Sequence, residues 1–144
     1  MGVTNFDEYR DVFVVADTID DVVHPVTYEL IGQARRIAKE LGQLVQVMLL
    51  GENVQSEAEE LVAHGADIVH VFESPLLKYY TTDGYTKVLT DFFEDHKPNI
   101  LLIGATNNGR DLAPRMSGRM KNGVVADCTI LTVDTEEGLV EWLS

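Results

Sequence analysis

Short β-branched apolar runs alternate with longer amphipathic segments along the chain, and this alternation restricts the fold more than any other feature. The run DVFVVA, residues 11–16, predicts a buried strand because it is short, apolar and followed by turn-forming residues. Parallel strands need a connection of a dozen or more residues, usually a helix. The alternation therefore predicts an α/β fold of three layers, a mostly parallel twisted sheet with helices on both faces.

The periodicity also gives approximate bounds for the elements. We expect strands at residues 11–16, 45–50, 68–72, 100–103 and 128–133, and helices at residues 25–41, 56–64, 84–95 and 110–120. Gly42 follows the first helix, where glycine commonly ends a helix. Ser56 with Glu59 three residues later fits a capping box. Residues 73–83 predict a loop or a broken turn.

The last residues depart from this cycle. Residues 129–133, the sequence DTEEG and residues 139–143 predict a C-terminal hairpin. Its second strand stops at Ser144 without a polar tail, so we expect the chain to be part of a longer protein. A short edge strand at a natural terminus is the alternative.

Composition limits the class of protein. With 144 residues and 45% apolar residues, the chain suits one domain, residues 1–144. It lacks an apolar run near the roughly 20 residues that cross a bilayer and also a signal-peptide pattern, so we expect a cytoplasmic protein without membrane insertion. The net charge of −13 argues against a nucleic-acid partner. Cys128 is the only cysteine, and we expect it to be a buried, inert thiol.

Four of the eleven Lys and Arg residues lie in one glycine-rich stretch, GATNNGRDLAPRMSGRMKNG, at residues 104–123. This stretch directly follows the predicted strand 100–103. If strand 11–16 is central and strand 100–103 is its neighbour, their carboxyl ends border the crevice in which such sheets bind ligands. The residues that we expect to line this crevice are Asp17, Thr18, Gly104, Thr106, Asn108, Gly109 and Arg110.

Two interpretations of this stretch stay open. In the structural one, Asn108 caps a helix and Asp111 is its reciprocal partner. In the functional one, backbone N–H groups and the Arg110 guanidinium face a nucleotide or a partner chain. A P-loop does not fit, because Arg110 and Asp111 stand where the phosphate-binding Lys and the Ser or Thr would be.

Two further basic residues of the stretch fall on the predicted helix 110–120. Arg115 and Arg119 are four residues apart and share a helix face. That face is either solvated or, together with Arg110, an interface for an acidic partner surface. Pro114 is expected in the first turn of the helix, where its missing N–H costs little.

Catalytic groupings do not assemble in this sequence. The four histidines are scattered without HExxH or HxH spacing, and a GxSxG motif is absent. We therefore expect no catalytic residue, no metal site and no enzymatic activity. His24 precedes Pro25 near the end of the first strand, where it either lines the crevice or only begins the helix.

The stretch GATNNGRDLAPR, followed by Ala126-Asp127-Cys128-Thr129, closely resembles the segment typical of the electron transfer flavoprotein alpha subunit. Agreement is looser elsewhere and includes HGAD before the third strand. The resemblance covers nearly the whole chain. The sequence departs from the usual pattern at Met116-Ser117, where small apolar residues are common, and at Asp17, where Glu is commoner.

This resemblance implies a role in electron transport. Proteins of the family are heterodimers of alpha and beta subunits that carry electrons through FAD from dehydrogenases, such as those of fatty acid oxidation, to a quinone reductase or another acceptor. Their alpha subunit has an N-terminal domain of the adenine nucleotide alpha hydrolase-like fold and a C-terminal domain that holds most of the FAD. The resemblance implies that this chain is the N-terminal domain, without the FAD domain and without a cofactor of its own.

The resemblance also bears on the glycine-rich stretch. The related beta subunit binds AMP at a comparable crevice, whereas the alpha N-terminal domain is regarded as structural, which favours a scaffold or docking role for residues 104–119. The alternative is a free-standing nucleotide-binding module that resembles the universal stress proteins, which share the fold. Their GxxGxxxxxxxxxG[ST] loop is matched poorly, because Arg119 follows the last of the glycines Gly104, Gly109 and Gly118.

Overall fold

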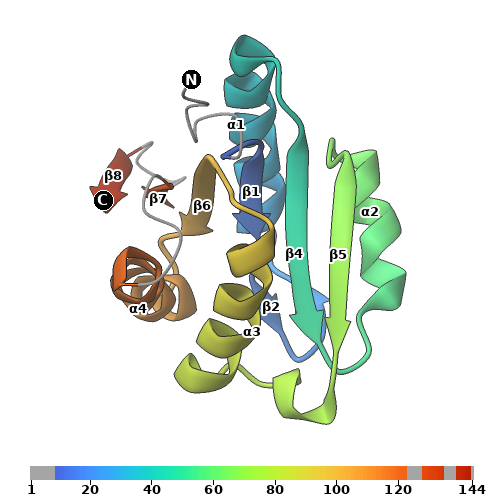
Figure 1. Cartoon of the computed structure of the whole chain (residues 1–144). Helices are drawn as coiled ribbons and strands as arrows, with labels where there is room; N and C mark the ends of the chain where they lie inside the picture. The colour runs from blue at the N-terminus through green and yellow to red at the C-terminus, as the bar shows by residue number, and fades with distance from the viewer. Residues whose placement is uncertain (1–8, 123–127, 135–138, 144) are drawn as a thin grey trace.

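The computed structural model describes residues 9–122, 128–134 and 139–143, and its centre is a six-stranded sheet (Figure 1). In spatial order its strands are β5 (Ile68–Glu73), β4 (Val45–Gly51), β1 (Val12–Val15), β6 (Ile100–Gly104), β7 (Thr129–Asp134) and β8 (Leu139–Leu143). The first five are parallel, and β8 pairs with β7 in antiparallel fashion. The predicted parallel sheet and C-terminal hairpin are therefore confirmed, while the residues that connect the hairpin, 135–138, lie outside the described residues.

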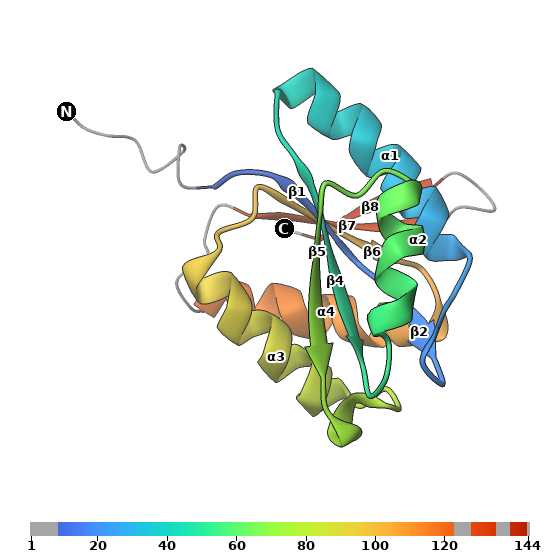
Figure 2. The same ribbon diagram turned by 90° about the vertical axis from the view of Figure 1, so that its right-hand side faces the viewer.

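Four α-helices cover the two faces of the sheet. Helices α1 (Val26–Leu41) and α2 (Ala58–Ala63) pack on one face, and α3 (Thr82–Asp95) and α4 (Asn107–Asn122) pack on the other (Figure 2). A sheet covered on both faces needs strands that are apolar on both sides. This explains why β1, with the sequence VFVV, is buried at every position. Within the described residues, no helix is long and apolar enough to cross a membrane.

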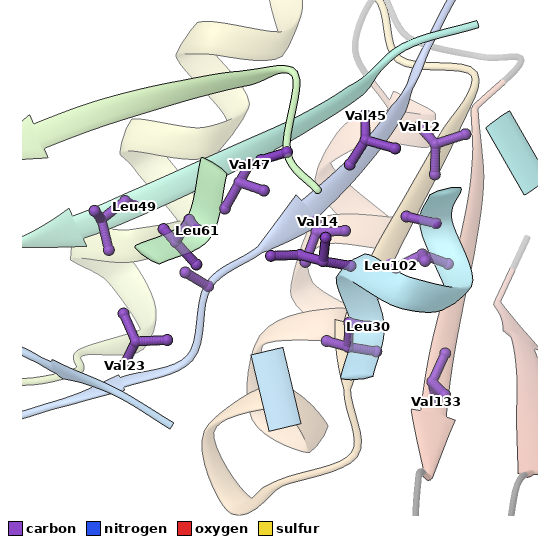
Figure 3. Close-up of a cluster of buried hydrophobic side chains, with 14 of the residues drawn as sticks. Val12, Val14, Val23, Leu30, Val45, Val47, Leu49, Leu61, Leu102 and Val133 are labelled. Atoms are coloured by element: carbon purple, nitrogen blue, oxygen red, sulfur yellow. The ribbon is translucent and has the colours of Figure 1, made fainter. Parts of the chain in front are cut away.

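Alternate residues of each strand enter two separate cores, because successive side chains of a strand point to opposite faces. Phe13 of β1 belongs to the core under α3 and α4, whereas Val14 belongs to the core under α1 and α2. In the second of these cores, Val14, Leu30 of α1 and Leu102 of β6 lie together, each fully buried (Figure 3). The central strands thus hold both helix layers in place.

Helix α1 ends where the sequence predicts. Gly42 follows it with a φ of +67°, and its amide donates to the Lys39 carbonyl oxygen over 3.3 Å. Glycine adopts this left-handed conformation without the steric cost that a Cβ brings.

The predicted capping box of the second helix is wrong. Ser56 lies in a 3-10 turn, η2 (Gln55–Glu57), ahead of α2, and neither element has a side-chain cap. The Glu73 carboxylate at the end of β5 accepts the amides of Val54 and Gln55 instead, over 2.8 and 3.2 Å. A distant acid therefore performs the role that the local pattern assigned to Ser56.

The segment predicted as a loop, residues 73–83, is more ordered than its composition indicates. It contains a second 3-10 turn, η3 (Pro75–Leu77), and the first residues of α3, which begins at Thr82. Thr81 caps α3, because its Oγ1 accepts the Gly84 amide over 3.2 Å. A threonine cap places the start of α3 two residues before the predicted one.

A small antiparallel hairpin between β1 and α1 is not predicted by the sequence analysis. Its strands are β2 (Thr18–Ile19) and β3 (Val22–Val23), and Asp20 and Asp21 form its tip with φ values of 52° and 64°. Two residues per strand are too few for a periodic signal, and two aspartates are not the usual residues of such a turn.

We expect Leu102→Ala to lower the free energy of unfolding by about 2–5 kcal/mol, because it leaves a cavity in a fully buried site. Leu44→Ala is the matched control, since this side chain is 45% exposed and its removal should change the free energy by about 0.5 kcal/mol. Urea unfolding followed by circular dichroism measures both changes. Equal losses for the two variants would contradict the core position of Leu102.

Candidate functional site

Strand β1 lies between β4 and β6, so the chain leaves it toward β4 on one side and returns through β6 on the other. In sheets of this kind the ligand crevice lies at the carboxyl ends of the strands where the strand order reverses. The end of β1 and the start of the GATNNGRD segment meet at that point in this structure.

Five of the seven residues expected in the crevice line one pocket there, namely Asp17, Thr18, Gly104, Asn108 and Gly109. The tyrosines Tyr80 and Tyr85 complete its wall. The remaining cavity has a volume of ≈ 20 Å³, which holds about one water molecule. The fold thus provides the crevice, and aromatic side chains fill it, so an adenine ring does not fit in this arrangement.

Tyr85 is the better buried of these two tyrosines, with 3% of its surface exposed. Its hydroxyl donates to the Leu77 carbonyl oxygen over 2.9 Å and lies 3.5 Å from the Thr18 hydroxyl. Burial, together with the negative charges of Asp21 and Asp17, raises the pKa of Tyr85. The phenol therefore stays neutral at physiological pH and fixes the ring in the crevice.

Thr106 and Arg110, the other two expected residues, line a separate open groove of ≈ 450 Å³ between the starts of α1 and α4. His24 lines this groove and not the crevice pocket. Its Nδ1 accepts the amide of Val26, the first residue of α1, over 3.0 Å. Two roles were considered for His24, and the structure shows the one in which it lies at the start of the helix and bonds to its first residue.

The Arg110 guanidinium makes its contacts within the chain. Its Nε donates to the Ala105 carbonyl oxygen over 3.1 Å, and its Nη2 lies 3.8 Å from the Asp134 carboxylate. Because the side chain is about half exposed, this ion pair contributes little to stability. The guanidinium of Arg110, which we considered for binding a nucleotide, thus has an acidic partner, Asp134, in the same molecule.

The start of α4 differs from the prediction. The helix begins at Asn107, and its cap is Thr106, whose Oγ1 accepts the Gly109 amide over 3.1 Å. The Arg110 amide donates to the Thr106 carbonyl oxygen over 2.8 Å. The assignment of Asn108 as the cap is therefore wrong, and two amides that we considered for a ligand have partners in the first turn.

Pro114 consequently lies inside α4 and not in its first turn. Proline lacks the N–H that would bond to the Arg110 carbonyl oxygen and normally weakens a helix interior. The helix continues because Leu112, Ala113, Met116 and Met120 are buried against the sheet. Tertiary packing thus overrides the local signal that placed the helix start too late.

Gly109 is required by a close approach of two backbone segments. A Cβ on this residue would lie 1.7 Å from the Gly104 carbonyl oxygen. The start of α4 therefore packs directly against the end of β6. The Gly104 to Gly109 spacing, which mimics half of a P-loop, serves this helix-to-strand contact.

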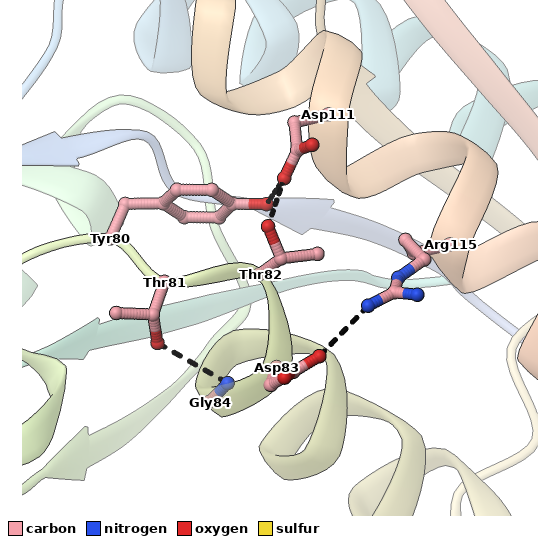
Figure 4. A network of polar contacts seen from close by, with 7 residues as sticks. All are labelled: Tyr80, Thr81, Thr82, Asp83, Gly84, Asp111 and Arg115. Carbon is pink, nitrogen blue, oxygen red and sulfur yellow. Dashed lines mark hydrogen bonds and ion pairs between the residues drawn. The ribbon is translucent and has the colours of Figure 1, made fainter.

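Asp111 joins α4 to the start of α3 (Figure 4). Its Oδ2 accepts hydrogen bonds from the Tyr80 hydroxyl, over 2.7 Å, and from the Thr82 hydroxyl. These bonds, with that of Thr82 the larger, lower the pKa of Asp111. Burial and the bond to Asp111 raise the pKa of Tyr80. The carboxylate, which was expected to assist a helix cap, instead holds Tyr80 against the crevice.

The predicted interface arginines on α4 differ in their surroundings. Arg115 donates to the Asp83 carboxylate over 2.8 Å (Figure 4), so it pairs with α3. Arg119 is exposed, and among the residues described it has no ion-pair partner. It therefore remains the candidate for contact with another molecule.

The other reactive side chains show no catalytic arrangement. In residues 9–122, 128–134 and 139–143, no group of three or more His, Cys, Asp or Glu side chains could hold a metal ion. His70 bonds to the Gln46 amide oxygen over 2.6 Å, and burial and the charge of His96 lower its pKa. Cys128 is only partly buried, in contrast to the expectation, although burial raises the pKa of its thiol to about 12.

Sequence reasoning missed the residues that fill and brace the crevice. Tyr80 and Thr82 lie in the segment that we expected to be a loop, and Tyr85 lies at the start of the helix after it. The clustering of tyrosines was the available signal. This cluster of tyrosines could not be assigned to the crevice from the sequence. The residues that the tyrosines contact, at the end of β1 and on α4, are more than twenty residues away in the sequence.

Comparison with known proteins places this architecture in a family. The family model described as "Electron transfer flavoprotein domain" matches residues 12–142. The chain belongs to the electron transfer flavoprotein family. This confirms the resemblance to the N-terminal domain of the alpha subunit, which the GATNNGRDLAPR stretch predicts. The resemblance also includes the sequence ADCT, of which residues 126–127 lie outside the described residues.

Several curated relatives match over most of the chain. The electron transfer flavoprotein subunit alpha of Megasphaera elsdenii is 44% identical over 135 residues, which cover 94% of this chain and 40% of the relative. The lactate dehydrogenase (NAD(+),ferredoxin) subunit LctC of Acetobacterium woodii is 45% identical over 92% of this chain and 32% of its own length. The acryloyl-CoA reductase electron transfer subunit beta of Anaerotignum propionicum is 42% identical, over 97% and 38%. The chain thus spans about two fifths or less of the length of these relatives.

We expect Gly109→Ala to destabilise this electron transfer flavoprotein domain by at least about 2 kcal/mol, because the new Cβ overlaps the Gly104 carbonyl oxygen. Gly118→Ala is the matched control in the same helix. No atom lies within 4 Å of a Cβ built on Gly118, so this change should stabilise the helix by about 0.5–1 kcal/mol. Chemical denaturation gives both values, and a neutral Gly109→Ala would contradict the close packing of α4 on β6.

The Asp111 bonds should make stability depend on pH. The pKa of Asp111 in the folded state lies below its ordinary value of 3.8, so its stabilising effect is complete above about pH 4 and is lost as the pH falls through the folded pKa. The difference in unfolding free energy between the wild type and Asp111→Asn should therefore be constant from about pH 5 to 7 and shrink below about pH 4. Tyr80→Phe, which removes one donor, should show part of this effect in a urea series at each pH.

Proposed function

We propose that this chain forms the α/β domain of an electron transfer flavoprotein alpha subunit. In the intact protein, a heterodimer with a beta subunit carries electrons through FAD from dehydrogenases to an acceptor such as a quinone reductase. The domain itself acts as a scaffold and docks the other subunit. The observation that carries this proposal is the family match over residues 12–142, together with relatives named as electron transfer subunits.

The geometry of the crevice supports a scaffold role. Ligand pockets usually offer a few hundred Å³, whereas the crevice pocket is reduced to ≈ 20 Å³ by Tyr80 and Tyr85. Both rings are held by hydrogen bonds, and Tyr85 is almost fully buried. The residues present therefore do not fit a flavin or an adenine nucleotide here. We propose that FAD is bound by the part of such a protein that this chain does not span.

A nucleotide-binding module is less well supported. A phosphate-binding loop of that class needs glycines in an extended loop whose amides face the ligand. Here Gly109 and Gly118 both lie within α4, and the Gly109 amide already has a partner in Thr106. The glycine spacing therefore serves the helix and its contact with β6.

The proposal predicts different flavin contents for two proteins. A complete alpha subunit with this sequence, purified together with its beta subunit, should carry FAD and show a flavin absorption spectrum. Residues 1–144 alone should be colourless and should give no heat signal with ATP or AMP at micromolar concentrations, because the crevice is filled. Stoichiometric flavin on residues 1–144, or micromolar nucleotide binding, would instead favour the nucleotide-binding module.

A further inference from the structure

Four exposed apolar side chains gather at the carboxyl end of the sheet, on segments far apart in the sequence. They are Ile19 and Val22 of the β2–β3 hairpin, and Leu76 and Tyr79 in and after η3. Both views place the hairpin and the turn after β5 at the same end of the molecule (Figures 1 and 2). We propose that these four residues, with the acids around them, form the surface that docks the partner subunit; we call it the hairpin edge. The proposal rests on the proposed function and identifies which surface performs the docking.

The hairpin presents its apolar pair in a fixed direction. Ile19 and Val22 are cross-strand partners, so their side chains lie on the same face of the ribbon. Each is 60% exposed, whereas Thr18 and Val23, the other cross-strand pair, are buried. One face of the hairpin, with Thr18 and Val23, is therefore buried against the protein, and the other face, with Ile19 and Val22, is exposed.

Hydrogen bonds from neighbouring segments hold this hairpin, which is too short to be stable alone. The Asp21 carboxylate accepts the amides of Glu52 and Asn53 over 2.9 and 3.1 Å, which ties the tip to the loop after β4. The Thr18 hydroxyl donates to the Leu50 carbonyl oxygen over 3.1 Å. Asp20 and Asp21 have positive φ values, which cost energy in residues other than glycine. The chain therefore keeps a strained ribbon in place that exposes two aliphatic side chains.

Lys78 joins the second apolar pair to this ribbon. Its ammonium group lies 3.9 Å from the Asp20 carboxylate and 3.9 Å from that of Glu52. The same group is 5.7 Å from the centre of the Tyr79 ring. Leu76 lies in η3 and Tyr79 two residues after its end, and they are 83% and 65% exposed. Lys78 thus links the two pairs through Asp20 and Glu52, and exposed apolar surface bordered by polar residues is typical of interaction sites.

The charge around the hairpin edge determines the kind of partner. Residues 17–23, 51–53 and 73–79 contain Lys78 as their only Lys or Arg. The acids in these segments are Asp17, Asp20, Asp21, Glu52 and Glu73. An interface with an apolar centre and charges at its rim is stabilised when the facing rim carries the opposite charge. The partner that fits is a protein surface with an apolar centre bordered by Lys and Arg.

This charge also argues against two other occupants. In a symmetric dimer of this chain the same patch would face itself, so acidic rims would oppose each other in molecules that already carry a net charge of −13. The anionic lipids of a membrane surface would be repelled in the same way. The hairpin edge therefore fits a different protein with a basic rim.

The test uses the complete alpha subunit that contains these residues and its separately purified beta subunit. We expect the double variant Ile19→Ser/Val22→Ser to weaken the dissociation constant of the pair at least about tenfold, because both side chains lie at the proposed interface. Val62→Ser on α2 is the matched control, with a side chain that is 52% exposed on another surface, and it should change the constant less than about twofold. Glu52→Lys reverses one rim charge and should weaken binding most at low ionic strength. Circular dichroism and thermal midpoints establish that each variant folds.

The outcomes separate this proposal from the proposed function. If the wild-type subunits associate and the hairpin variants bind as tightly as the wild type, the hairpin edge is not the docking surface, while the proposed docking of the two subunits is supported. A loss of affinity in Arg119→Ser alone would place docking on α4 and also overturn the hairpin edge. If the wild-type subunits do not associate at all, the proposed function fails and the hairpin edge with it. If the double variant changes only self-association of the alpha subunit, a second copy is the occupant and the proposal is overturned.

Discussion

The burial of β1 on both faces is the constraint on which the rest of the structure depends. Its four residues pair with β4 on one side, three of them also pair with β6 on the other, and none is more than 5% exposed. Because Phe13 and Val14 point into opposite cores, the helices on both faces pack against the same strand. The reversal of strand order at β1 also creates the crevice. The site therefore follows from the position of this strand, and the side chains around its end decide whether the crevice is open.

Carboxylates account for much of the order at the ends of the sheet. The acid Asp11 accepts the Leu44 amide over 2.9 Å, Asp67 accepts the Val45 amide over 2.8 Å, and Glu73 accepts two amides ahead of α2. Hydrogen bonds from backbone N–H groups to ionised acceptors are stronger than those between neutral groups. The acidity of the chain is thus partly structural, because these acids replace local caps that the sequence does not supply. At the hairpin tip, Asp21 also accepts two amides, whereas Asp20 is exposed and contributes to the acidic rim.

The parallel sheet and the helix layers could be predicted from the sequence because they depend on local periodicity and on general rules of parallel sheets. Of the strand order, we assumed only that strand 11–16 is central and that strand 100–103 is its neighbour. The ends of the predicted strands differ from the observed ones by at most one residue, and Gly42 follows the end of α1 as expected. Two of the failures share one physical cause, which is that a distant residue replaces a local signal. Glu73 caps the region assigned to Ser56, and Asp111 bonds to Tyr80 and not to its own helix start. The Asp111 contact depends on the packing of α3 on α4, and the Glu73 contact on the place of β5 beside β4. A single sequence reveals neither arrangement.

The same argument explains why the crevice could be located but not interpreted from sequence. Glycine spacing alone is compatible with a phosphate loop and with a close helix-to-strand contact, and the position of the Gly104 carbonyl oxygen beside Gly109 shows the second. Thr106 caps α4, its oxygens accept the Gly109 and Arg110 amides, and the tyrosines occupy the remaining space. The crevice in which this fold commonly binds nucleotides is therefore closed in this chain. The hairpin edge exposes four large apolar side chains beside acidic residues, so contact with another protein is the function that we propose for this surface.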